Sequence, residues 1–189
     1  NDNDKTKLHL SLTQLTEKNK DDIFDIVLNI IKKNNQLISL IYDFAIQQDY
    51  YSNIYSKLCV YLRDNIVDKS ILEKKIIDSL ETFFYSRLEN ESKYQSYIKF
   101  ISYLGLNKFI SSKIIEICID SIILNLKNES INCSQEILSL YNIFSITKFK
   151  LNDEYRLLMN ELSTNKQKIK LSKDRFKIKD IIELQLELN

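Results

Sequence analysis

The stretch QLISLIYDFAIQQDYYSNIYSKLCVYL, residues 36–62, decides the fold class. Its apolar residues recur at three- and four-residue spacing, which places them on one face of an α-helix. They form two sets separated by residues 47–49: Leu37, Ile41, Phe44 and Ala45, then Tyr51, Tyr55, Leu58 and Leu62. Because so short a break leaves room only for a tight connection, the stretch predicts an antiparallel hairpin of two amphipathic helices whose apolar faces cover each other.

The same periodicity continues along the chain and predicts roughly nine or ten helices at intervals of about 15 to 20 residues. Two such helices make a unit of about 35 to 40 residues, the size of a HEAT or armadillo repeat. We therefore expect an all-α fold, a right-handed α-solenoid of about five antiparallel helix pairs; a compact irregular bundle would give a similar pattern. Residues 1–10 are polar and predict a flexible N-terminal segment, followed by a single domain over residues 11–189.

Three local signals predict where helices begin and end. The Thr16 hydroxyl is suited to cap a helix that runs to about Lys33. Ser70 and Glu73 have the spacing of a capping box. Gly105 follows a periodic run, where a left-handed helix cap favours glycine.

The composition excludes several kinds of site. One glycine and no proline leave no glycine-rich phosphate loop or nucleophile elbow. One histidine, His9, and three scattered cysteines cannot form the usual tetrahedral zinc site. Carboxylates and tyrosines are plentiful, but on amphipathic helices we interpret them as solvated or packed side chains. The sequence thus predicts no enzyme, cofactor or metal.

The cysteines and the hydropathy bear on the cellular environment. Cys59, Cys118 and Cys133 are odd in number and lie within helical patterns. They predict buried, reduced thiols in a cytoplasmic or nuclear protein. No apolar run reaches membrane-spanning length, so we expect no membrane partner. The chain begins with Asn rather than Met, which suggests a domain excised from a longer protein.

One charged run stands out near the C-terminus, KQKIKLSKDRFKIKD at residues 166–180. With a net charge of only +1, any grip on nucleic acid must come from such a local patch. The run contains seven cations and, before its final residue, one acid, Asp174: Lys166, Lys168, Lys170, Lys173, Arg175, Lys177 and Lys179. It could be a solvated loop and helix start, a surface that contacts RNA phosphates, or a surface for an acidic protein.

Four segments, in order, resemble the middle domain of eukaryotic translation initiation factor 4G. The first is LTQLT, residues 12–16, and the second is the 36–62 stretch, with LIYD followed by Ala45 and Ile46 and later by Leu58 and Cys59. The third is YIKFISYLGLNKFISSKII, residues 97–115, and the fourth is SKDRFKIKDIIEL, residues 172–184.

The resemblance implies a five-repeat HEAT solenoid without enzymatic activity, a monomeric cytoplasmic scaffold of translation initiation. Such a domain binds and stimulates a DEAD-box RNA helicase, touches RNA and meets other initiation factors. Leu12, Leu15 and Thr16 match the family's helicase-binding motif, whereas Glu17 replaces its proline and Lys20 its phenylalanine. Related adaptors of poly(A)-binding-protein regulation, splicing or nonsense-mediated mRNA decay share part of this pattern. A purely structural helical-repeat protein is the alternative of another class.

Overall fold

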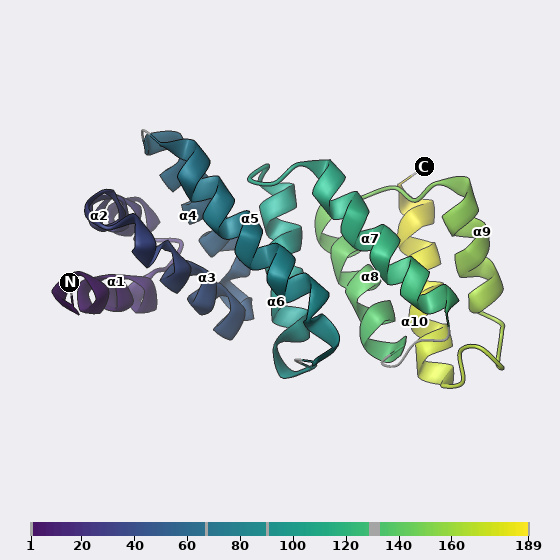
Figure 1. Ribbon diagram of the computed structural model, residues 1–189. Helices are drawn as coiled ribbons and strands as arrows, with labels where there is room; N and C mark the ends of the chain where they lie inside the picture. The colour runs from purple at the N-terminus through teal and green to yellow at the C-terminus, as the bar shows by residue number, and fades with distance from the viewer. Residues whose placement is uncertain (1, 67, 90, 129–132, 189) are drawn as a thin grey trace.

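The computed structural model describes residues 2–66, 68–89, 91–128 and 133–188. Within these ranges it contains ten α-helices, three short 3₁₀ turns and no strand (Figure 1). The first helices are α1 (Asp2–Gln14), α2 (Lys20–Lys33), α3 (Ile38–Gln47), α4 (Ser52–Asn65) and α5 (Lys69–Tyr85). The others are α6 (Glu91–Leu106), α7 (Ser112–Lys127), α8 (Cys133–Thr147), α9 (Asp153–Leu162) and α10 (Ser172–Glu187). The 3₁₀ turns are η1 (Asn35–Leu37), η2 (Asp49–Tyr51) and η3 (Arg87–Glu89). The prediction of an all-α chain is confirmed.

The helices pack into an elongated array. The even-numbered helices contact one another in series, α2 with α4, α4 with α6, α6 with α8 and α8 with α10. Of the odd-numbered helices, α1 packs on α2 and α3, α3 packs on α5, α7 packs on α6 and α8, and α9 packs on α10. Figure 1 shows α1 and α10 at opposite ends of the array. Such an arrangement is consistent with a helical repeat, because each helix is buried mainly by its neighbours.

The predicted hairpin is present as α3, η2 and α4. The Gln48 amide donates to the Phe44 carbonyl at 2.9 Å and so closes the end of α3. Six of the eight residues of the predicted stripe are buried, and Ile41, Ala45, Leu58 and Leu62 are 0 % exposed. The other two differ, since Leu37 is half-buried in η1 and Tyr51 is 40 % exposed in η2. The two helices do not cover each other alone, since both also pack on α6. A third helix, which begins at Glu91 and is separated from α4 by α5 and η3, therefore completes the burial that the sequence assigned to the pair.

The N-terminal segment differs from the prediction. Asn1 lies outside the described residues, but residues 2–14 form the single helix α1 rather than a flexible tail. Leu8 is 0 % exposed and lies one turn before Leu12, so these two side chains anchor α1 to α2 and α3. Apolar periodicity does not identify this helix, because polar residues surround its two core leucines.

Two helices also begin at residues other than those predicted. The second helix begins at Lys20, not after Thr16. Residues 15–19 instead form a turn in which the Thr16 amide donates to Asn19 Oδ1 at 2.7 Å. At α5, Asp68 replaces Ser70 as the capping residue, because its carboxylate accepts from the Ile71 amide at 3.4 Å.

Gly105 has a different role from the predicted left-handed cap. It lies inside α6, and the residue with positive φ is Lys108, at 62°. A Cβ at Gly105 would stand 2.7 Å from Cγ1 of Ile115 on α7. Because such a contact is too short for two carbon atoms, glycine at this position lets α6 and α7 approach closely.

Candidate functional site

The predicted basic run, which we call the C-terminal basic surface, spans the α9–α10 connection and the first two turns of α10. Lys166, Lys168 and Lys170 lie on the connection. The other members lie on α10: Lys173, Arg175, Lys177 and Lys179. Four of the seven are exposed, namely Lys166, Lys170, Lys173 and Lys179. The run lies at the end of the array opposite α1 (Figure 1).

The connection is held in place by its apolar residue and by Arg175. Ile169 is 1 % exposed and belongs to the core, although lysines flank it on both sides. The Arg175 guanidinium donates to the carbonyls of Ile169 and Lys170, to the latter at 3.0 Å. Arg175 is thus largely occupied within the chain, and it positions the neighbouring lysines.

The one internal acid of the run is turned away from solvent. Asp174 is 7 % exposed and accepts a hydrogen bond of 2.6 Å from the Ser134 hydroxyl on α8. Its carboxylate therefore serves the α8–α10 contact and is almost fully buried, at the wall of the cleft that Lys168 and Lys170 also line. The exposed charges of residues 166–179 are consequently all positive.

An aromatic ring is exposed among these cations. Phe176 is 63 % exposed, and Lys173 and Lys179 flank it at three-residue spacing on the same helix face. The Lys179 ammonium lies 5.2 Å from the centre of the Phe176 ring. Lys177 faces the other way, 4.2 Å from the Tyr141 ring on α8 and 3.6 Å from the Asp180 carboxylate. Lys177, like Arg175, is therefore engaged within the chain.

A cleft of about 620 Å³ opens beside this surface. Lys168 and Lys170 line one side, and Ser134 and Gln135 from the first turn of α8 line the other. Ammonium, hydroxyl and amide groups of this kind are hydrogen-bond donors suited to phosphate oxygens. Glu91 and Asp174 also line the cleft, and their carboxylates would oppose an anion there.

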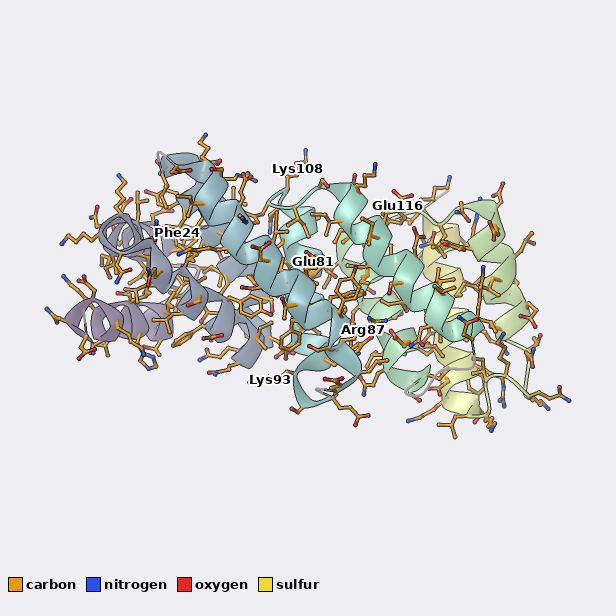
Figure 2. All side chains as sticks on the ribbon, viewed as in Figure 1. Phe24, Glu81, Arg87, Lys93, Lys108 and Glu116 are labelled. Atoms are coloured by element: carbon orange, nitrogen blue, oxygen red, sulfur yellow. The ribbon has the colours of Figure 1, made fainter. Side chains whose placement is uncertain are left out.

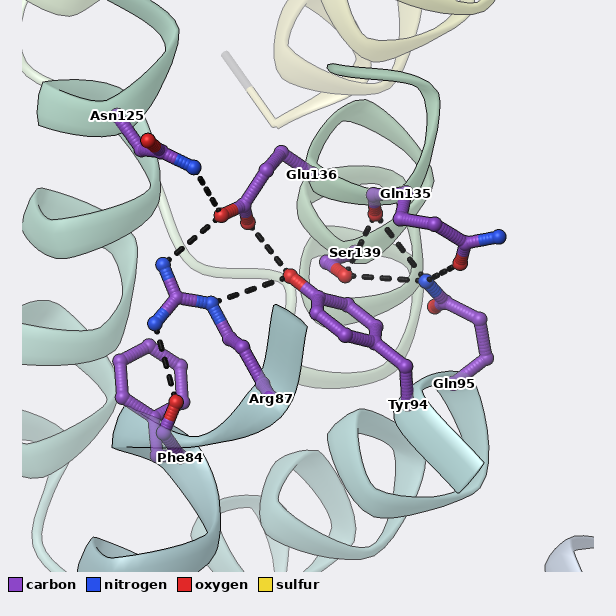
Figure 3. Close-up of polar contacts among 8 residues, drawn as sticks. All are labelled: Phe84, Arg87, Tyr94, Gln95, Asn125, Gln135, Glu136 and Ser139. Atoms are coloured by element: carbon purple, nitrogen blue, oxygen red, sulfur yellow. Dashed lines mark hydrogen bonds and ion pairs between the residues drawn. The ribbon is translucent and has the colours of Figure 1, made fainter. Parts of the chain in front are cut away.

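The first turn of α8 forms one wall of this cleft. Three consecutive residues of that turn bond to three other elements: Ser134 to α10, Gln135 to Gln95 of α6, and Glu136 to Arg87 of η3. Figure 3 shows the bonds of Gln135 and Glu136. Gln95 Nε2 donates to Gln135 Oε1 at 2.9 Å. This turn joins the C-terminal basic surface to the middle of the array.

Glu136 is the centre of a buried polar cluster. It is 0 % exposed and accepts from Arg87 Nη2 at 2.8 Å, from Tyr94 Oη at 2.5 Å and from Asn125 Nδ2 at 2.6 Å. Arg87 is 6 % exposed and also donates to the Phe84 carbonyl at 3.0 Å. These hydrogen bonds compensate for the free-energy cost of removing the Arg87 and Glu136 charges from water. The cluster is therefore a structural junction of η3, α6, α7 and α8.

Proton affinities in the cluster follow from this pairing. Burial by itself lowers the pKa of Arg87, but the Glu136 charge and hydrogen bond outweigh it and the pKa is raised overall. Burial and the adjacent Glu136 raise the pKa of the Tyr94 hydroxyl well above its usual value. Arg87 therefore stays cationic and Tyr94 stays protonated over the physiological pH range.

The fold buries two of the three residues that the family resemblance assigns to helicase binding. Leu12 and Leu15 are 1 % and 4 % exposed, inside the core that joins α1 to its neighbours. Tyr55 Oη donates to the Leu12 carbonyl at 3.4 Å, which adds a polar contact at the same place. Thr16 alone is exposed, and its hydroxyl is engaged with Asn19. The two leucines cannot contact a partner while α1 is packed in this way.

The three cysteines and His9 were also singled out from the sequence. Burial raises the pKa of Cys59 and of Cys118 to about 12, and that of Cys133 to about 11, so these thiols stay protonated at neutral pH. His9 is exposed, with its ring 5.0 Å from that of Phe44. In the described part of the chain, no group of three or more metal-binding side chains comes together, and no helix is long and apolar enough to cross a membrane.

Sequence reasoning missed three features of this region. It treated Asp174 as one more surface charge, although its place four residues before Ile178 puts it on the buried face of α10. It left Arg87 and Glu136 unassigned, because nothing in their sequence neighbourhood links residues 49 positions apart. The exposed Phe176 entered only through the family resemblance. No family model matches the chain, and no curated protein is significantly similar to it.

Proposed function

We propose that this chain is a non-enzymatic binding scaffold that contacts RNA through its C-terminal basic surface. In this proposal the ten helices form a right-handed solenoid of about five antiparallel pairs of the HEAT type. The serial contacts of the even-numbered helices support such a repeat. The four matching segments further suggest a monomeric cytoplasmic domain of the initiation factor 4G middle-domain type, which meets other initiation factors.

The RNA proposal rests on which charged side chains of residues 166–179 are exposed and which are buried. Four lysines are exposed while the one acid of the segment is buried and bonded to Ser134. An exposed row of cations with no interspersed acid attracts a phosphate backbone. An acidic protein would also satisfy the lysines, but the exposed Phe176 between Lys173 and Lys179 favours RNA, since aromatic rings stack on unpaired bases.

Fluorescence anisotropy with a labelled single-stranded RNA of about 20 nucleotides tests this proposal. We expect Lys166→Glu/Lys170→Glu/Lys173→Glu to weaken binding by about tenfold or more, because three phosphate contacts become repulsive. Phe176→Ala should weaken it by about tenfold through loss of one stacked base. The matched control is Lys5→Glu/Lys7→Glu/Lys18→Glu, which makes the same charge change at exposed positions of the opposite end. If both triple variants lose RNA affinity equally, the loss reflects net charge, and the assignment of RNA binding to the C-terminal basic surface is wrong.

The helicase part of the proposal rests on the family resemblance and needs a different contact from the two leucines. The exposed residues next to them are Thr13, Gln14, Thr16 and Glu17. A scaffold that prefers one arrangement of the two helicase lobes biases that equilibrium, typically by about 1–3 kcal/mol. We therefore expect the domain to raise the ATP turnover of an initiation-type DEAD-box helicase.

The helicase test compares that turnover with and without the domain. Thr13→Arg/Glu17→Arg, which changes only exposed side chains, should abolish the stimulation, whereas the Lys5, Lys7 and Lys18 variant above serves as a second surface change on the same side. No stimulation by the wild-type domain would remove the initiation role and leave the RNA-binding role to its own test. Binding with inhibition would instead favour a regulatory adaptor.

A further inference from the structure

A second surface lies between the outer helices α5 and α7. Helix α5 packs on α3 and α4, whereas α7 packs on α6 and α8, so a groove of about 230 Å³ remains between them. Its floor is formed by Leu80, Tyr97, Ile101 and Cys118, and its walls include Phe84 and Ile117. In Figure 1 the two helices cross the front of the array next to each other.

The neighbouring seam between α7 and α9 shows what this groove lacks. There, Tyr155 Oη donates to Asp120 at 2.7 Å, and the Lys127 ammonium lies 3.7 Å from the Glu154 carboxylate. Between the described residues of α5 and those of α7, no hydrogen bond or ion pair is formed. Polar bridges therefore close one outer seam, and the other remains open and apolar.

The groove presents almost no polar atoms to an incoming ligand. Tyr97 points its hydroxyl at the Leu80 carbonyl, where it donates a hydrogen bond, so only ring carbons face the groove. At the rim, Ile117 is 53 % exposed and Tyr85 is 71 % exposed. Apolar side chains gathered in this way, next to a concave apolar floor, are typical of a protein-binding site rather than of free surface.

The groove carries one negative charge. In the described part of the chain, Glu81 is the charged residue that lines it, and its exposed carboxylate forms no ion pair with a described residue. Two nearby carboxylates face elsewhere, since Asp78 lines a cleft on the α3 side of α5 and Asp120 accepts a hydrogen bond from Tyr155 of α9. Figure 2 shows Glu81 and Glu116 on the two facing helices. A cationic occupant would be favoured over an anionic one, so RNA is not suited to this surface.

We propose that the α5–α7 groove binds an amphipathic, cationic helix of a partner protein. The volume has room for side chains and not for a whole helix, so the partner would rest on the rim and insert apolar residues spaced by three and four positions. A lysine or arginine beside those residues would face Glu81. The site is formed by helices other than those of the C-terminal basic surface, and it functions whether or not RNA is bound.

The probe is a fluorescein-labelled helical peptide of about 18 residues, with leucines at three- and four-residue spacing on one face and lysines on the other. Its partner probe carries glutamate at every lysine position. We expect saturable binding of the lysine peptide and at least about tenfold weaker binding of the glutamate peptide. Ile117→Asp should weaken the lysine peptide by about tenfold or more, because Ile117 stands at the groove wall.

Two matched variants separate the groove from general charge effects. Leu124→Asp adds the same carboxylate at an equally exposed position of α7, 59 % exposed and outside the groove, and should leave binding unchanged. Glu81→Lys should weaken the lysine peptide and strengthen the glutamate peptide. Methyl NMR spectra should place the perturbation at Ile77, Ile114 and Ile117 and leave the exposed Ile26 of α2 unaffected.

Three results would overturn the proposal. These are the absence of saturable binding to the wild-type chain, equal effects of Ile117→Asp and Leu124→Asp, and methyl shifts that do not involve the groove. Sedimentation of the chain alone provides a further check. Self-association that Ile117→Asp abolishes would assign the groove to a second copy of this chain and exclude a separate partner.

Discussion

The two ends of the molecule carry the residues that the sequence singled out for binding, and the fold treats them in opposite ways. At the N-terminal end, Leu12 and Leu15 are buried and hold α1 to the array. At the C-terminal end, four lysines of the basic run remain exposed. The difference teaches that a motif of apolar residues on an amphipathic helix identifies a fold before it identifies a contact. Charged side chains are the more direct sign of an available surface, because burying them is costly.

The largest expected effect separates core from surface within α1. Leu12→Asp should lower the free energy of unfolding by at least about 4 kcal/mol, since it removes a packed side chain and buries a carboxylate. Leu10→Asp is the matched control, on the same helix but 54 % exposed, and should change stability by about 0.5 kcal/mol or less. Urea unfolding followed by circular dichroism measures both. Equal effects would mean that α1 is not packed as described.

Within the basic run, too, we expect a buried and an exposed position to differ in their effect on stability. Ile169→Ala should lower the free energy of unfolding by about 2–4 kcal/mol, because Ile169 is 1 % exposed and anchors the α9–α10 connection. Leu171→Ala, at a position that is 51 % exposed, should cost about 0.5 kcal/mol. The same urea titration applies. If both substitutions are neutral, the connection is not fixed against α10 and the lysines have no defined arrangement.

A smaller effect is expected at Thr16, the one exposed member of the N-terminal motif. Thr16→Val keeps the shape of the side chain but removes the hydroxyl that bonds with Asn19. We expect a loss of about 1 kcal/mol, the usual value of such hydrogen bonds. Thermal unfolding of this variant next to Thr13→Val, whose hydroxyl bonds only to the Leu10 carbonyl of its own helix, provides the comparison. A neutral Thr16→Val would show that the turn does not depend on this hydroxyl.

The smallest stability effect should come from the lysines. Lys166→Glu/Lys170→Glu/Lys173→Glu changes three exposed side chains and should shift the free energy of unfolding by no more than about 1 kcal/mol. Differential scanning calorimetry checks this. A large loss would mean that these lysines serve the fold, and it would then be impossible to attribute a binding defect of this variant to lost phosphate contacts.

The sequence was most informative where apolar periodicity decides structure. It placed the 36–62 helices correctly, because spacing alone identifies a buried helix face. It failed at α1, where two core leucines were hidden among polar residues, and at Gly105, whose role depends on the distance to Ile115 on the next helix. Such distances between helices are not encoded in any local pattern.

The candidate sites show the same limit. Residues 166–179 could be recognised from charge, but the burial of Asp174 by Ser134 required the α8–α10 contact. The α5–α7 groove could not be recognised at all, since its apolar residues read as ordinary helix core. Only the positions of the two outer helices reveal that some of those side chains lack a covering element.

The salt dependence of RNA binding tests the central claim, that the C-terminal basic surface contacts phosphates, most directly. Each phosphate contact on single-stranded RNA contributes about 0.7 to the slope of log affinity against log salt concentration. The account predicts that the slope of the Lys166, Lys170 and Lys173 triple variant is shallower than that of the wild type by about 2, and that the Lys5, Lys7 and Lys18 variant keeps the wild-type slope. An unchanged slope in the first variant would contradict the account and make this run a solvated loop and helix start.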